Sequence, residues 1–300
     1  MSPTAQPQAT AFAHGAVPPV AAADADPRAE GAAIGALAAT QARALGRALL
    51  PWALPLAVLA IWQAGASLGL ISSRVLPAPT DVVLAFWRTL NDGSLLANIW
   101  VSTGRALSGL AIGGGIGFAL GVLTGVFRPA ETAFDSAMQM LRNVPHLAII
   151  PLVILWFGIG EEAKVFLVAV GVAFPLYLNT FHGIRTVDRA LVEMARVYGL
   201  SSVALFWRIV LPGALPSVLV GLRYALGIMW LTLIVAETIS SSAGIGYMTM
   251  NAREFLQTDV VVLGVLAYAL LGKLADSLTR AIEQRALAWH PAYQAGTGGV

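Results

Sequence analysis

The chain has 300 residues, 57% of them hydrophobic and only 11% charged, with a mean hydropathy of +0.75 and a net charge of +2. This composition excludes an ordinary soluble domain, in which about a quarter of the residues are charged, and the small net charge gives no indication of a nucleic-acid partner. The absence of cysteine excludes disulfides, thiolate metal ligands and a cysteine nucleophile. Continuously apolar windows of about 20 residues predict an all-α polytopic membrane protein rather than a β-barrel.

The first 48 residues differ in composition from the rest of the chain. They are rich in Ala, Pro, Gly and Gln, with no helical period before about Gln41. No basic stretch leads into an apolar run, so we expect a disordered tail over 1–48 rather than a cleaved signal peptide. We expect a transmembrane domain over 49–285 and a C-terminal tail over 286–300.

Six membrane-spanning helices are predicted from the apolar runs. They cover about residues 51–70, 104–127, 145–159, 165–181, 214–236 and 260–278. Between the first two, Pro79-Thr80-Asp81 begins a helix whose apolar residues recur at i, i+3 and i+4. That helix is too polar to span, and we expect it to lie at the membrane interface.

Glycines recur every four residues along the second predicted span. They are Gly109, Gly113, Gly117, Gly121 and Gly125. They fall on one helix face, where small residues let two helix backbones approach closely. A nucleotide-binding loop is the alternative, but neither GxGxxG nor GxxxxGK[ST] fits the spacing. We therefore predict that these glycines pack helices together.

The distribution of Lys and Arg predicts the orientation in the membrane. With both termini in the cytoplasm, ten arginines fall on the cytoplasmic side. Five basic residues fall on the opposite side, among them Lys164 and, near the outer end of the second span, Arg105. We expect a multi-pass protein with both tails cytoplasmic.

A polar-edged segment, EMARVYGLSSVALFWRIVLP, interrupts the apolar runs at residues 193–212. Asp188 is a good N-cap for a helix over 189–198, and Gly199 suits the left-handed position after it. Ser201 or Ser202 then caps a second helix, which we expect Pro212 to end. An ordinary connecting loop is the alternative, but these caps and turns favour a docking element for a cytoplasmic partner.

The spacing within this segment resembles the EAA loop of ABC importer permeases, which reads EAA, three residues, G, nine residues, IxLP. The matching residues are Glu193, Met194, Ala195, Gly199, Ile209, Leu211 and Pro212. Met194 is the single departure, because the family pattern has alanine there. The resemblance implies that the segment forms a coupling helix in a groove of an ATP-binding subunit.

The resemblance extends over about residues 50–293 and is greatest to the aliphatic sulfonate branch of the nitrate, sulfonate and taurine group. The stretches that carry it include LRNVPHLAIIPLVILWFGIG, GIMWLTLIVAETIS, GIGYMTMNAREFLQTDVVVL and the terminal WHPAY. It implies a type I ABC importer permease fold in a bacterial cytoplasmic membrane, with a core at about 98–282 and a coupling loop over 183–212. It implies a homodimer, two ATPase subunits and a binding protein that delivers the substrate. Because the chain lacks a Walker A sequence, ATP and Mg²⁺ are expected on the partner ATPase, and no cofactor on this chain.

Two ionisable residues of the fifth predicted span are candidates for the translocation path. Arg223 either meets the anionic substrate or snorkels to the cytoplasmic headgroups. Glu237 is about 21 Å farther along the helix, too far to pair with Arg223. It is expected to face the outer vestibule or to pair with a neighbouring helix. His146 and His182 have no metal-ligand spacing, so no metal site is predicted.

Two other classes of protein are alternatives to an importer permease. An enzyme is not expected, since the serines at 239–244 have no base near them in the sequence. A secondary transporter driven by an ion gradient is the better rival, but no internal repeat is found. Within the importer class, taurine, nitrate or another small organic anion remains an alternative substrate to an aliphatic sulfonate.

Overall fold

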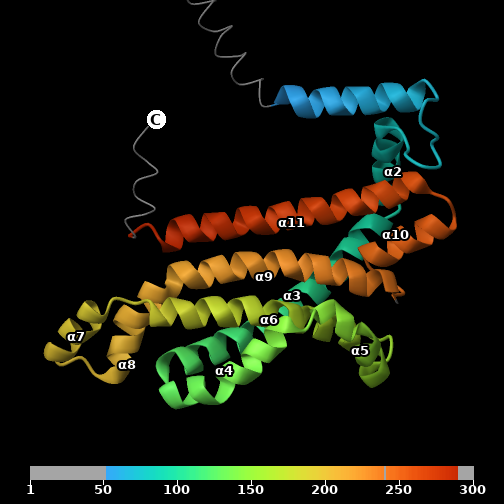
Figure 1. Cartoon of the computed structure of the whole chain (residues 1–300). Coiled ribbons are helices and arrows are strands. Elements are labelled where there is room, and N and C mark those ends of the chain that lie inside the picture. The colour runs from blue at the N-terminus through green and yellow to red at the C-terminus, as the bar shows by residue number, and fades with distance from the viewer. Residues whose placement is uncertain (1–51, 240, 290–300) are drawn as a thin grey trace, which may run out of the picture. The chain divides into compact units, whose positions relative to one another are not determined.

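The structure, a computed structural model, describes residues 52–239 and 241–289 (Figure 1). The predicted tail over 1–48 and the residues from 290 onward lie outside this part. The chain divides into two units, Met1–Ala60 and Ile61–Val300. The described residues of the first unit, 52–60, are helical. The described residues of both units contain helices and no strands, as the apolar runs predict.

The second unit is built from the helices labelled in Figure 1 and two short irregular turns. They are α2 (Pro79–Asn91), α3 (Ser94–Val126), α4 (Arg128–Asn143), a 3₁₀ turn η1 (His146–Ile149), α5 (Ile150–Phe157), α6 (Glu161–Arg185), α7 (Arg189–Val197), α8 (Ser202–Leu205), a π turn η2 (Phe206–Val210), α9 (Leu211–Ile239), α10 (Ile245–Glu254) and α11 (Thr258–Ala286). Trp52–Ser67 is a further helix.

Four helices of the described part are long and apolar enough to cross a membrane. They are Ser94–Val126, Glu161–Arg185, Ser202–Ile239 and Thr258–Ala286. Each contains one predicted span. The predictions at 51–70 and 145–159 correspond to the shorter apolar helices Trp52–Ser67 and His146–Phe157, so the count of six is not confirmed. His146–Phe157 rises only about 18 Å, because it lies between Pro145 and the left-handed Gly158.

Three long helices, α3, α6 and α9, pack side by side, and α11 lies along α9 (Figure 1). Their shared core is made of apolar side chains such as Val168 and Val172 from α6, and Met229 and Leu233 from α9. α2 lies against α11 and α3, and α10 connects α9 to α11. This packing holds the ends of α3, α6, α9 and α11 in fixed positions, where their polar residues meet.

The predicted glycine face of α3 is turned toward α6. All five glycines are buried, and a Cβ on Gly113 or Gly117 would overlap a backbone carbonyl of α6. A Cβ on Gly121 would lie 2.6 Å from the Thr180 Cβ. By contrast, a Cβ on Gly115 would meet nothing within 4 Å. The absence of side chains on this face is therefore what allows α3 and α6 to lie in backbone contact.

The prediction that Pro212 ends a helix is wrong, because residues 202–239 form one uninterrupted helix. A proline inside an α-helix removes one hydrogen bond, and its ring clashes with the carbonyl four residues earlier. Here the π turn η2 comes directly before it, and the Leu211 N–H bonds to the Phe206 carbonyl five residues back. The wider turn accommodates the proline, so the helix continues into α9.

Candidate functional site

The loop segment, which we define as residues 183–212, has a short helix with a hydrogen-bonded cap at each end. The Asp188 side chain accepts a hydrogen bond from the Ala190 N–H at 2.8 Å, which caps the start of α7. After α7 the chain turns at Gly199, whose φ is +77°. The Gly199 and Leu200 N–H groups bond back to the Arg196 and Ala195 carbonyls at 2.9 and 3.1 Å. These caps fix the shape of a helix that is too short to persist alone in water.

One exposed face of α7 is apolar, although Arg189, Glu193 and Arg196 of the same helix are also exposed. Leu191 and Met194 are exposed, and Val197 and Tyr198 are 87% and 77% exposed. Trp207 of η2 is also exposed. Large apolar side chains that gather on one face without cover are typical of a surface that binds another protein or a membrane.

The seven residues of the predicted coupling motif differ in exposure. Glu193, Met194 and Gly199 are exposed, whereas Ala195 is buried. Ile209, Leu211 and Pro212 are partly buried where η2 joins α9. The structure thus places Glu193, Met194 and Gly199 on the outside of the segment. It places Ile209, Leu211 and Pro212 at the connection to a long helix.

A cavity of about 830 Å³ lies between the loop segment and the adjacent ends of α3 and α6. Four arginines, Arg128, Arg185, Arg189 and Arg196, and the single acidic residue Glu193 line it together with apolar side chains. The cavity beside the loop segment is therefore lined by more positive than negative side chains.

Arg223, the first translocation-path candidate, connects two long helices. Its guanidinium pairs with Glu283 of α11, and its Nε lies 3.9 Å from the Asp276 carboxylate of the same helix. The Arg223 side chain is 42% exposed, whereas that of Glu283 is almost fully buried. Arg223 therefore holds α9 against α11 in this structure, and its charge is already paired.

Glu237, the second candidate, is buried at the end of α9 and does not face an open vestibule. Its carboxylate accepts hydrogen bonds from the Ser102 hydroxyl at 2.8 Å and the Tyr268 hydroxyl at 2.7 Å. It also accepts from the Gly246 N–H at 2.9 Å and forms an ion pair of 2.7 Å with Arg105 Nη1. Of the two expectations for Glu237, the structure shows pairing with neighbouring helices.

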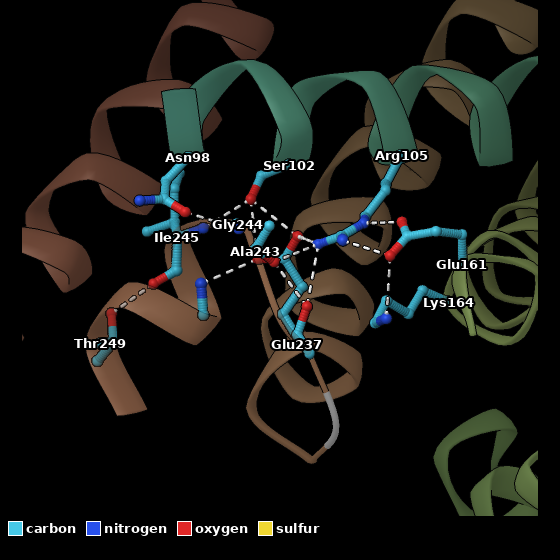
Figure 2. Close-up of polar contacts among 12 residues, drawn as sticks. Asn98, Ser102, Arg105, Glu161, Lys164, Glu237, Ala243, Gly244, Ile245 and Thr249 are labelled. Atoms are coloured by element: carbon cyan, nitrogen blue, oxygen red, sulfur yellow. Dashed lines mark hydrogen bonds and ion pairs between the residues drawn. The ribbon is translucent and has the colours of Figure 1, made fainter. Parts of the chain in front are cut away.

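Arg105 is the centre of this arrangement, as Figure 2 shows, with a carboxylate on either side of its guanidinium. One edge donates to Glu237 and to the Ala243 carbonyl, the latter at 2.7 Å. The other edge donates through Nε and Nη2 to both oxygens of Glu161, the first residue of α6. Lys164 Nζ lies 3.3 Å from the same Glu161 carboxylate.

We call Ser102, Arg105, Glu161, Lys164, Glu237 and Tyr268 the polar cluster. The formal charges of its two cations and two carboxylates sum to zero. Each buried charge needs a partner of opposite sign, because a buried charge without a partner strongly destabilises the fold. The cluster joins α3, α6, α9 and α11 at one place.

Sequence reasoning missed most of the polar cluster. The distribution of basic residues assigns Arg105 and Lys164 only to the outer side of the membrane, although α3 begins at Ser94 and contains Arg105 well inside it. The partners of Arg105 are 56 and 132 residues away in the sequence. The sequence does contain one indication of the cluster, namely charged residues within or beside apolar helices. Such residues generally indicate a functional site.

Within the described residues, no group of three or more His, Asp or Glu side chains is placed to hold a metal ion. His146 Nε2 forms a hydrogen bond of 3.0 Å with the Thr232 hydroxyl, and His182 is exposed at the end of α6. The two histidines are therefore not brought together.

Comparison with known proteins identifies a family for this arrangement. Residues 113–287, more than half of the chain, match the family described as "Binding-protein-dependent transport system inner membrane component". The matched range contains the loop segment and both translocation-path candidates, but not Arg105.

Curated relatives cover most of the chain. It is 59% identical over 243 residues to the "Putative aliphatic sulfonates transport permease protein SsuC" of Escherichia coli (strain K12), covering 81% of this chain and 92% of that protein. It is 44% identical to the Bacillus subtilis (strain 168) protein of the same name, covering 87% and 98%. The taurine transport system permease protein TauC of Escherichia coli is 34% identical, covering 78% and 86%.

Solved structures show the same fold. An amino acid ABC transporter chain aligns with a TM-score of 0.56 at 14% identity, covering 67% of this chain and 97% of that one. A chain of the MetNI methionine ABC transporter aligns with a TM-score of 0.50 at 20% identity, covering 63% and 96%. At these identities the likeness concerns the fold alone.

The chain belongs to the family of inner membrane components of binding-protein-dependent transport systems. This agrees with the resemblance carried by the spacing of the loop segment. The relatives are permeases by name, in agreement with the expectation that this chain is not an enzyme.

Proposed function

We propose that this chain, as a member of that family, is the permease subunit of an ATP-driven importer that carries aliphatic sulfonates across the bacterial cytoplasmic membrane. The observation that carries the proposal is 59% identity over 92% of a permease named for aliphatic sulfonates. Identity falls to 34% for the taurine permease and to 30% for a bicarbonate permease. Taurine, nitrate or another small organic anion is the second candidate substrate.

The proposed topology has six spans with both termini in the cytoplasm. Four are the long apolar helices, and the two shorter ones, Trp52–Ser67 and His146–Phe157, complete the set. In this orientation the loop segment lies on the cytoplasmic side and the polar cluster toward the outer side. The basic residues of the loop segment support the assignment, because cytoplasmic loops carry an excess of Lys and Arg.

The proposed assembly is a homodimer with two ATPase subunits and a soluble binding protein. ATP and Mg²⁺ would bind to the ATPase, since this sequence has no Walker A motif. The exposed apolar face of α7 supports the ATPase contact, because Val197 and Tyr198 have no cover in the described chain. The seven motif residues, Glu193 to Pro212, would carry that contact into α9 through η2.

If the long helices rock against one another during transport, the ion pairs between them must break. Arg223 joins α9 to α11, and Glu237 joins α9 to α3. We propose that both residues line or gate the translocation path through these pairs. Opening would then exchange one set of paired charges for another, as in other two-state interfaces.

Reconstituted transport tests the proposed function. The permease, its ATPase and its binding protein are placed in proteoliposomes, and uptake of radiolabelled ethanesulfonate is measured with and without ATP. We expect uptake only with ATP and with an active ATPase, and a higher kcat/KM for ethanesulfonate than for taurine or nitrate. Uptake driven by an ion gradient without the ATPase would overturn the importer mechanism. A higher kcat/KM for taurine or nitrate would overturn the substrate.

A further inference from the structure

The Glu161 carboxylate lies between solvent and two buried cations. The Glu161 side chain is 56% exposed, whereas those of Arg105 and Lys164 are 5% and 4% exposed. Arg105 donates two parallel hydrogen bonds to the two Glu161 oxygens, and Lys164 approaches one of them at 3.3 Å (Figure 2). An exposed acidic side chain thus covers two buried cations.

The two cations keep their positions through contacts that do not involve Glu161. Arg105 Nη1 is held by Glu237 and the Ala243 carbonyl, both at 2.7 Å. Lys164 Nζ lies 3.3 and 3.4 Å from the Gly160 and Ile159 carbonyls. If the Glu161 side chain left, Arg105 and Lys164 would therefore stay in place as two oriented donors.

The Glu161 side chain is placed where it can leave Arg105 without a movement of the backbone. Glu161 is the first residue of α6, and its side chain is 56% exposed. The start of a helix also offers free N–H groups that favour an anion. A change of the Glu161 rotamer would move its carboxylate off Arg105 while the Gly160 and Ile159 carbonyls that hold Lys164 stay in place.

The charge balance of the polar cluster indicates which kind of group can replace the Glu161 carboxylate. With Glu161 present, the cluster sums to zero, and without it Arg105, Lys164 and Glu237 leave one positive charge. A monovalent anion restores neutrality. A sulfonate presents oxygens that a planar guanidinium fork can bind in a bidentate manner, as it binds a carboxylate.

We propose that Arg105 and Lys164 form a binding site for the sulfonate group of the transported molecule, and that Glu161 occupies this site until the substrate replaces it. The identity of the anion rests on the proposed function. Glu161 is then an internal competitor, which lowers the apparent affinity for free substrate in this state of the protein. The site would act as the first contact for an anion that enters the permease.

Anion-dependent stability of the intact complex with its ATPase, without the binding protein, tests the site. The complex is kept in dilute Tris chloride, since many common buffers carry sulfonates, and the chloride concentration is held low and constant because chloride is itself a monovalent anion. Thermal unfolding is followed with increasing ethanesulfonate. We expect Glu161→Gln to lower the melting temperature and ethanesulfonate to restore it. The half-maximal concentration should be at least about tenfold lower than in the unchanged protein, because the competitor is gone. Uncharged dimethyl sulfone should have no such effect.

Glu162→Gln is the matched control. Glu162 is adjacent and exposed, and it makes no ion pair among the described residues. It should behave as the unchanged protein does. Adding Lys164→Met to Glu161→Gln should abolish the restoration. A Glu161→Gln complex whose stability does not respond to ethanesulfonate would overturn the site, and so would an equal response in Glu162→Gln.

A second variant covers the case in which Glu161→Gln cannot be purified. The chain has no cysteine, so Glu161→Cys introduces a single thiol at an exposed position. A thiol reagent that attaches an ethylsulfonate should raise the melting temperature, and one that attaches a trimethylammonium should lower it. Equal effects of the two reagents would overturn the proposal. Failure of ethanesulfonate uptake, with anion binding intact, would instead refute the proposed substrate.

Discussion

The loop segment and the polar cluster lie at opposite ends of the same two helices and are stabilised in opposite ways. Hydrogen bonds between residues a few positions apart shape the loop segment, which leaves its large apolar side chains exposed. Apart from the Lys164–Glu161 pair, the contacts of the polar cluster join side chains 31 to 135 residues apart, and the cluster is largely buried. The first is suited to binding a partner, and the second to holding helices together or releasing them.

This difference predicts how each region responds to substitution. Local caps contribute about 1 kcal/mol each, so their loss changes the loop segment without unfolding the molecule. A buried ion pair that loses one partner costs several kcal/mol, because the remaining charge is left unpaired. Changes in the polar cluster should therefore affect stability, and changes in the loop segment should affect transport.

The largest effect is expected for Arg105→Met. It leaves Glu237 buried without a cation, which costs about 3–5 kcal/mol. We expect the loss of a monodisperse, folded complex in size-exclusion chromatography and thermal unfolding. Arg88→Met is the control, since the Arg88–Asp259 pair is exposed and should contribute no more than about 1 kcal/mol. Adding Glu237→Gln should partly restore Arg105→Met. Equal losses of stability in the Arg88 and Arg105 variants would contradict the prediction that changes in the polar cluster affect stability most.

The next effect concerns the glycine face that connects the two ends. Gly117→Leu places a side chain where α3 touches the α6 backbone, so the helices must separate at a cost of at least about 2 kcal/mol. We expect weaker assembly, measured as loss of the detergent-stable complex. Gly115→Leu, on the open side of the same helix, should assemble normally. Similar losses in both variants would show that helix propensity rather than packing is responsible.

The smallest change in stability is expected for Gly199→Val. A β-branched residue at φ +77° is strained by about 1–2 kcal/mol, which reduces the population of the native turn about tenfold. Under the proposed function, uptake should fall about tenfold while the melting temperature stays nearly constant. Gly199→Asn should retain most of the uptake, since asparagine tolerates this conformation. Normal uptake by Gly199→Val would argue against a coupling role.

Sequence reasoning succeeded where the determining contacts are local. Asp188 and Gly199 could be assigned as caps because each bonds within a few residues of itself. The long helices could be predicted from apolar length alone. The glycine repeat identified one face of α3, although the sequence did not identify α6 as the helix that packs against it.

The same reasoning failed where geometry depends on a neighbour or on an irregular turn. Pro212 continues a helix because the π turn before it removes the clash that the proline rule assumes. Hydropathy over 145–159 could not show that the helix ends at Gly158. The pairing of Arg105 with Glu237 depends on packing between distant helices, and no local pattern encodes it.

The π turn at Phe206–Val210 also determines how α9 is rotated about its own axis relative to α8. Each residue of an α-helix turns the chain by about 100°, so one additional residue in a turn rotates everything that follows by that angle. Deleting one residue from η2 would turn the apolar side of α9, with Met229 and Leu233, away from the core. The additional residue in the π turn thus determines the direction of the Glu237 side chain relative to α8. The two lie at opposite ends of the 38-residue helix Ser202–Ile239.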